Sequence, residues 1–169
     1  ASGVTGRGDD AFVGRADVAD AGFEPVEDLD AALPRADVVT LHLPALPEGR
    51  PLMKARQFSQ MRQGTWFVNV ARGSLVDEAA LRAALADGTV AGAALDVFAI
   101  EPIADDDPLL ALENVVLTPH VASATRECRD RMSAAAIRNA IAGIDGCLDP
   151  EDVINPDVLV QGQGSGRSS

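Results

Sequence analysis

Between residues 28 and 144 short apolar runs alternate with helical segments, and this alternation limits the fold more than any other feature. Runs rich in Val, Leu and Ala predict strands at residues 37–43, 65–70, 90–97 and 114–118. Helical spacing and capping residues predict helices at residues 28–36, 53–61, 77–86 and 123–144. Strands joined by crossover helices favour a parallel sheet, and strands apolar on both sides indicate that both faces are covered. We therefore expect a doubly wound α/β fold.

The composition excludes several classes of function. The 169 residues suffice for one domain, and a formal net charge of −12 argues against binding to nucleic acid or to an anionic membrane. The two cysteines form neither a disulfide framework nor a Cys-x-x-Cys metal motif, so we expect no metal site. No apolar run approaches the ~20 residues that cross a bilayer, and no signal peptide is visible. We expect a cytoplasmic protein.

Chemically useful side chains follow three of the predicted strands. Arg72 follows the second strand, Asp96 and Glu101 follow the third, and His120 follows the fourth. Ligands bind beyond the carboxyl ends of parallel strands, so these residues are expected at one edge of the sheet. Taken singly, each has a simpler explanation as a surface arginine, a turn-capping aspartate, a loop glutamate or a structural histidine. Their joint occurrence at one edge favours a catalytic site.

Four segments carry a resemblance to a known family. They are ADVVTLHLP at residues 36–44, FVNVARGSLVDEAAL at 67–81, AGAALDVFAIEP at 91–102 and NVVLTPHVASAT at 114–125. Together they resemble the NAD-binding domain of the D-isomer-specific 2-hydroxyacid dehydrogenases, which include phosphoglycerate, glycerate and D-lactate dehydrogenases. The resemblance implies a Rossmann-type domain of an oxidoreductase that acts on the CH–OH group of a 2-hydroxy acid, with NAD as acceptor and NADP not excluded.

The resemblance also implies roles for individual residues. Arg72 matches the arginine that binds the substrate carboxylate, His120 the catalytic histidine, and Glu101 the acid paired with that histidine. A bidentate guanidinium suits a carboxylate, and an imidazole suits proton exchange with the substrate hydroxyl. Glu101 also favours a hydroxy acid over formate, because related formate dehydrogenases carry Gln there. The positions expected to line the cofactor are Leu43, Pro44, Val70, Ala71, Arg72, Asp96, His120, Val121, Ala122 and Ser123.

The N-terminal part departs from the family pattern. The family's Gly-x-Gly-x-x-Gly loop, which cradles the cofactor's pyrophosphate, has no match, and Gly3, Gly6 and Gly8 are interpreted as loop. Asp17 and Asp20 are weak candidates for the acid that binds the adenosine ribose. The family's substrate domain also lacks a counterpart, so the resemblance implies an N-terminally truncated chain.

These observations divide the chain into four parts. We expect an irregular N-terminus at residues 1–12, a partial NAD-binding domain at 13–146, a segment returning toward the substrate domain at 147–160 and a flexible tail at 161–169. Within the third part, residues 152–158 resemble the strand that returns to that domain.

Two functions remain open. The first is a dehydrogenase for a small 2-hydroxy or 2-keto acid, with a possible homodimer expected from the family. The second is a catalytically inactive remnant, or a protein-interaction module of the same fold. Without a phosphate cradle or a second domain to close the cleft, we expect the isolated chain to turn over barely or not at all.

Overall fold

A computed structural model describes residues 6–8, 14–26, 28–157 and 159. The chain forms two compact units, Ala1–Ala122 and Ser123–Ser169. The predicted four-part division stays a prediction.

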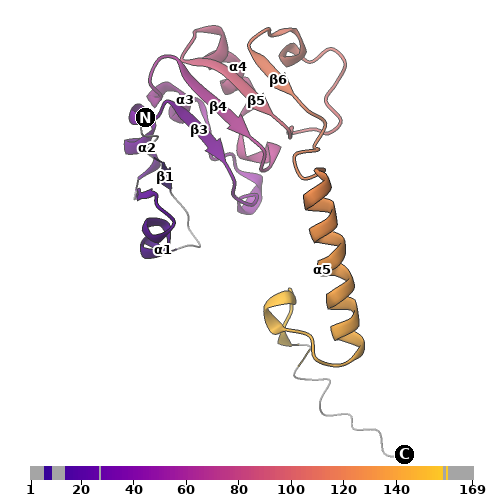
Figure 1. The fold of residues 1–169 in the computed structure, drawn as a ribbon. Coiled ribbons are helices and arrows are strands. Elements are labelled where there is room, and N and C mark those ends of the chain that lie inside the picture. The colour runs from indigo at the N-terminus through magenta and orange to yellow at the C-terminus, as the bar shows by residue number, and fades with distance from the viewer. Residues whose placement is uncertain (1–5, 9–13, 27, 158, 160–169) are drawn as a thin grey trace, which may run out of the picture. The chain divides into compact units, whose positions relative to one another are not determined.

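The first unit is built on a four-stranded parallel sheet. Its strands are β3 (Val38–Leu41), β4 (Thr65–Asn69), β5 (Val90–Leu95) and β6 (Val115–Leu117), hydrogen-bonded in the order β3-β4-β5-β6 (Figure 1). All four predicted strands are confirmed, each shorter than its apolar run. The spatial order follows the chain order because each connection crosses over to the next neighbouring strand. The parallel α/β fold is thereby confirmed.

Helices α3 (Ala55–Gln60) and α4 (Glu78–Ala86) connect these strands and pack on one face of the sheet. Phe58 of α3 meets Phe67 of β4 edge to face, with ring centroids 5.4 Å apart. Leu81 of α4 is fully buried in the same core. Each such side chain contributes about 1.5–3 kcal/mol of burial free energy.

On the opposite face of the sheet, strand side chains are exposed, so the described helices of the first unit cover one face only. The register places Val38, Trp66 and Val116 on this face, and Trp66 is 55 % exposed. The reason lies in the crossovers: right-handed connections that advance in one direction along a sheet all pass over the same face. Apolar strand residues therefore indicated a face suited to burial and not the element that covers it.

A small second sheet precedes the main one. Strands β1 (Arg7–Gly8) and β2 (Glu24–Pro25) pair in parallel, with α1 (Arg15–Asp20) between them. The interpretation of Gly8 as loop is therefore wrong, because a two-residue strand is too short to show any periodicity. Gly6, beside β1, permits a close approach to Phe23, whose Cδ1 would lie 2.4 Å from an added Cβ.

The weak candidates Asp17 and Asp20 lie on α1 and not at the end of a strand. Gly3 and most of the predicted irregular N-terminus lie outside the described residues. The predicted helix at residues 28–36 is confirmed in shorter form, as α2 (Leu29–Ala32) followed by a 3-10 turn, Leu33–Arg35.

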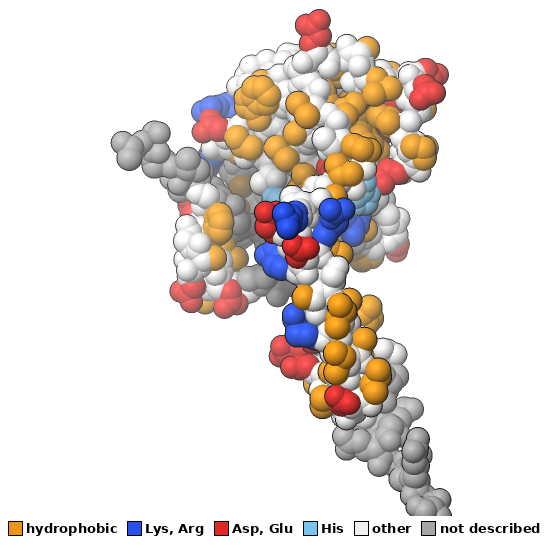
Figure 2. All heavy atoms as spheres, turned by 45° about the vertical axis from the view of Figure 1, so that its right-hand side comes forward, with side chains coloured by type: hydrophobic (Ala, Val, Ile, Leu, Met, Phe, Trp, Pro, Cys, Tyr) orange, Lys and Arg blue, Asp and Glu red, His pale blue; other side chains and the backbone are white. Residues whose placement is uncertain are grey.

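The second unit contains α5 (Arg126–Ile144), which confirms the last predicted helix. The Thr125 side chain caps it by accepting a hydrogen bond from the Cys128 N–H (3.1 Å). No residue of α5 is buried, and hydrophobic side chains, Ile137 and Ile141 among them, lie exposed along it (Figure 2). None of the described helices is long and apolar enough to cross a membrane.

The C-terminal segment forms a 3-10 turn, Pro150–Asp152, followed by bends and a helical turn. The strand expected at 152–158 is therefore wrong for the described part of that range. A strand needs a neighbouring edge to satisfy its backbone N–H and C=O groups, and the described residues offer none here. The expected flexible tail lies outside the described residues.

Candidate active site

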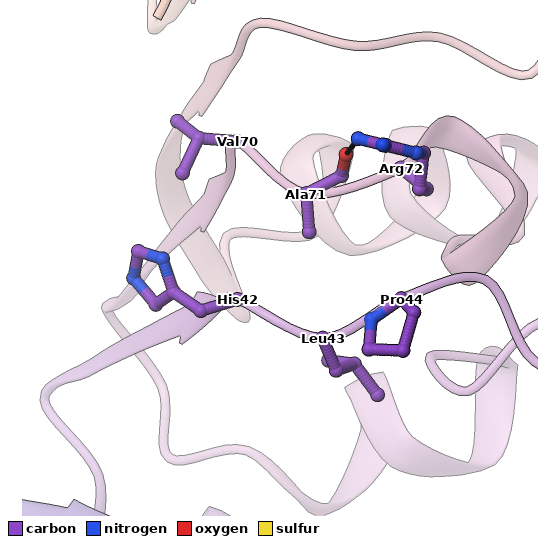
Figure 3. A pocket seen from close by; sticks show the side chains of 6 residues that line it. All are labelled: His42, Leu43, Pro44, Val70, Ala71 and Arg72. Atoms are coloured by element: carbon purple, nitrogen blue, oxygen red, sulfur yellow. Dashed lines mark hydrogen bonds between the residues drawn. The ribbon is translucent and has the colours of Figure 1, made fainter. Parts of the chain in front are cut away.

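A hollow of about 280 Å³ opens at the carboxyl ends of β3 and β4. Figure 3 shows its six lining residues, His42, Leu43, Pro44, Val70, Ala71 and Arg72. Five of these were expected at the site from the sequence, and His42 is the addition. Its signal in the sequence was its place near the end of the predicted strand at residues 37–43. The hollow therefore lies where an open parallel sheet binds its ligands.

Asn69, the last residue of β4, shapes the turn that carries Arg72. The Asn69 side chain is 1 % exposed; its amide donates to the Arg72 carbonyl (3.0 Å) and its oxygen accepts from the Ala71 N–H (3.0 Å). A buried amide with both ends satisfied holds a turn firmly. Sequence reasoning did not select Asn69 as a site residue, although it stands at a strand end.

The Arg72 side chain folds back along this turn, and its Nη1 donates to the Ala71 carbonyl (2.6 Å; Figure 3). A guanidinium carries five N–H donors, and this is the one bond that described residues accept from it. The exposed remainder is free to bind a carboxylate.

Gly73 brings the Arg72 turn against the segment after β5. A Cβ added to Gly73 would lie 1.9 Å from the Phe98 carbonyl oxygen and 2.0 Å from its carbon. Only glycine permits backbones to approach this closely. The loop that carries Arg72 thus packs directly on the loop that leads to Glu101.

Glu101 and His120 form the hydrogen-bonded pair expected from the sequence. The His120 Nδ1 lies 2.8 Å from Glu101 Oε2, while Glu101 Oε1 accepts from the Phe98 N–H at 3.0 Å. The His120 side chain is 51 % exposed, so its other nitrogen is open to a ligand. This arrangement suits a histidine that exchanges a proton at Nε2 while Nδ1 stays paired.

Asp96 follows β5 directly and is 3 % exposed. Its Oδ1 accepts from the Thr118 hydroxyl (2.5 Å) and the Val121 N–H (2.8 Å), and its Oδ2 accepts from the Ala122 N–H (2.8 Å). Asp96 therefore connects the end of β5 by hydrogen bonds to the segment that contains His120.

The predicted site residues thus fall into two groups. The first comprises Leu43, Pro44, Val70, Ala71 and Arg72 around the hollow. The second comprises Asp96, Glu101, His120, Val121 and Ala122, joined by hydrogen bonds. No hydrogen bond or ion pair between described residues joins Arg72 to His120, and Ser123 begins the second unit. The two groups meet through Gly73 and Phe98.

The two carboxylates of the second group have lowered pKa values. For Asp96, burial raises the pKa, but the hydrogen bonds from Thr118, Val121 and Ala122 and the nearby His120 together outweigh it. For Glu101, the Phe98 N–H and then His120 lower the pKa. A carboxylate whose pKa is lowered on folding stabilises the fold above its unfolded pKa, and this contribution is lost as the pH falls through the folded value.

We therefore expect the free energy of unfolding to fall as the pH drops below about 4, the ordinary range of carboxyl groups. In a Glu101→Gln variant this decline should be shallower, because one of the groups that takes up protons on unfolding is removed. Urea titrations followed by circular dichroism between pH 7 and pH 3 measure both slopes. Identical slopes for the two proteins would contradict a stabilising Glu101 carboxylate.

Comparison with known proteins decides the lineage. Residues 8–122 match the family model described as the D-isomer specific 2-hydroxyacid dehydrogenase, NAD binding domain. The chain belongs to this dehydrogenase family. The matched range contains both groups of site residues.

Among curated relatives of the dehydrogenase chain, glyoxylate/hydroxypyruvate reductase B of Escherichia fergusonii is 47 % identical over 131 residues, covering 78 % of this chain and 40 % of the relative. Glyoxylate reductase of Thermofilum pendens is 44 % identical over 132 residues, covering 78 % of this chain and 39 % of the relative. The chain therefore spans about two fifths of the length of these relatives.

Solved structures show the same relationship. The holo form of Rhodotorula graminis D-mandelate dehydrogenase matches with a TM-score of 0.74 at 28 % identity, covering 83 % of this chain and 41 % of that one. A D-isomer specific 2-hydroxyacid dehydrogenase from Xanthobacter autotrophicus, in complex with NADPH and MES, matches with a TM-score of 0.55 at 47 % identity, covering 59 % and 32 %.

Proposed function

We propose that this chain supplies the nicotinamide side of the active site in an enzyme that interconverts a small 2-hydroxy acid and its 2-keto acid. The observation that carries the proposal is the Glu101–His120 hydrogen bond, held beside the carboxyl ends of the strands. The names of the relatives favour glyoxylate and hydroxypyruvate as the keto acids.

The residues of the site fit such a cofactor. The hollow opens at the carboxyl ends of two parallel strands, and the Asp96 carboxylate retains one acceptor position, on Oδ2, that could receive a carboxamide N–H. When bound, the nicotinamide group supplies or accepts the hydride. We propose NAD as the acceptor, and NADP is the alternative to be compared because a structural relative binds NADPH.

The side chains then divide the remaining chemistry. Arg72 binds the substrate carboxylate through two parallel N–H···O bonds, which orients the neighbouring carbon. His120 gives a proton from Nε2 to the keto oxygen in reduction and takes it back in oxidation. The Glu101 carboxylate on Nδ1 fixes the tautomer and stabilises the imidazolium.

A second candidate is an inactive remnant that binds another protein. It is favoured by the exposed apolar sheet face around Trp66 and by the unburied apolar residues of α5. Dimer formation likewise stays a prediction.

A chimera separates the two candidates. In it, the aligned 131 residues of the Escherichia fergusonii reductase are replaced by those of this chain. We expect reduction of glyoxylate and hydroxypyruvate, measured with NADH and NADPH separately, because the host supplies the three fifths of the enzyme that this chain does not cover. A folded chimera that binds the nucleotide but reduces neither keto acid would favour the remnant.

A further inference from the structure

The segment from Thr118 to Ala122 has little to hold it in place except hydrogen bonds. His120 has a φ of 54°, a left-handed conformation that is uncommon for a residue other than glycine. Every residue of the segment is exposed, so packing does not fix its shape. The direction of the imidazole therefore depends on what binds this backbone.

Asp96, the residue directly after β5, provides that binding. Its carboxylate accepts the three bonds from Thr118, Val121 and Ala122, and its carbonyl accepts the His120 N–H at 2.8 Å. One buried residue thus holds the segment on both sides of His120. Hydrogen bonds that backbone N–H groups donate to an ionised carboxylate are shorter and stronger than those they donate to a neutral oxygen.

We propose that Asp96 is a positioning residue, which turns the imidazole of His120 so that Nδ1 meets Glu101. The ionised acid is required for this role. Asparagine has the same shape, but its NH2 group would face an N–H or O–H donor of the segment in either orientation. The Asp96→Asn variant must therefore lose at least one of the three bonds and set two donors against each other.

The importance of this role for catalysis rests on the proposed function, but the tautomer of His120 can be read in the chain itself without turnover. If the chimera reduces neither keto acid while His120 shows the expected tautomer, the proposed function is contradicted and the positioning role of Asp96 is supported.

Long-range ¹H–¹⁵N spectra of the full chain report the tautomer of each neutral histidine, and His42→Gln and His120→Gln variants assign the two signals. We expect His120 to be protonated mainly at Nδ1, a preference that Glu101→Ala should remove. In Asp96→Asn we expect this preference to fall about tenfold, and amide exchange at Val121 and Ala122 to accelerate about tenfold, as loss of one charge-assisted bond implies.

Two further variants keep the test decisive if Asp96→Asn folds poorly. Thr118→Val removes the hydroxyl donor and leaves the hydrogen bonds from the Val121 and Ala122 N–H groups. We therefore expect a smaller fall in the Nδ1 preference of His120 than in Asp96→Asn. Asp77→Asn alters another hydrogen-bonded carboxylate of the same unit, which caps α4, and should leave His120 unchanged. A wild-type tautomer in folded Asp96→Asn, or in Thr118→Val if the first variant unfolds, would overturn the proposal.

Discussion

Replacing His120 by Gln in the chimeric reductase is expected to lower kcat/KM for glyoxylate about 10³-fold, mostly through kcat. Gln can hydrogen-bond the keto oxygen but cannot deliver a proton, and general acid catalysis contributes about 10²–10⁴-fold. Steady-state rates over a range of glyoxylate concentrations separate kcat from KM.

The matched change is Glu101→Gln, which keeps the bond to the Phe98 N–H and removes the charge beside the imidazolium. A smaller loss, about 10²-fold, is expected because the histidine remains. Asp87→Asn, an exposed carboxylate after α4, should stay within about twofold. Near-normal kcat in His120→Gln would exclude His120 as the proton donor.

Replacing Gly73 by Ala is expected to cost about 3 kcal/mol of unfolding free energy, the upper part of the range for overpacking. The added Cβ would overlap the Phe98 carbonyl, which is backbone and cannot rotate away. Urea denaturation of the isolated chain, followed by circular dichroism, measures the loss.

The control is Gly143→Ala in α5, where no atom lies within 4 Å of the added Cβ. Alanine is favoured over glycine within a helix by about 0.5–1 kcal/mol, so this variant should gain helical signal and not lose stability. A Gly73→Ala variant with the same urea midpoint of unfolding as the wild type would contradict the close contact between the Arg72 loop and the Phe98 backbone.

Strands β3 to β6 could be predicted because each coincides with a Val-, Leu- or Ala-rich run between helical segments. Strands β1 and β2 could not be predicted, because two residues are too few to show the alternation of apolar and polar side chains that indicates a strand. The exposure of Trp66 was also beyond the sequence, since apolar composition shows which face is suited to burial and not what covers it.

The site divides in the same way. The Glu101–His120 contact could be predicted because the family motifs name both residues and parallel strands deliver both to one edge. The hydrogen bonds from the His120 segment to Asp96 could not be predicted. The donors lie 22 to 26 positions further along the chain, and two of them are backbone N–H groups, which carry no residue-type signal. The left-handed conformation of His120 also has no signature in its residue type alone.

A direct measurement of the central claim is a ¹H–¹⁵N titration of the isolated chain with reduced nicotinamide mononucleotide, which tests the nicotinamide side alone. We expect weak, saturable shifts of the amides of Val70, Ala71, Val121 and Ala122, the backbone positions of the two site groups. Absence of shifts at these amides, or shifts confined to the exposed face around Trp66, would contradict a nicotinamide site in this chain.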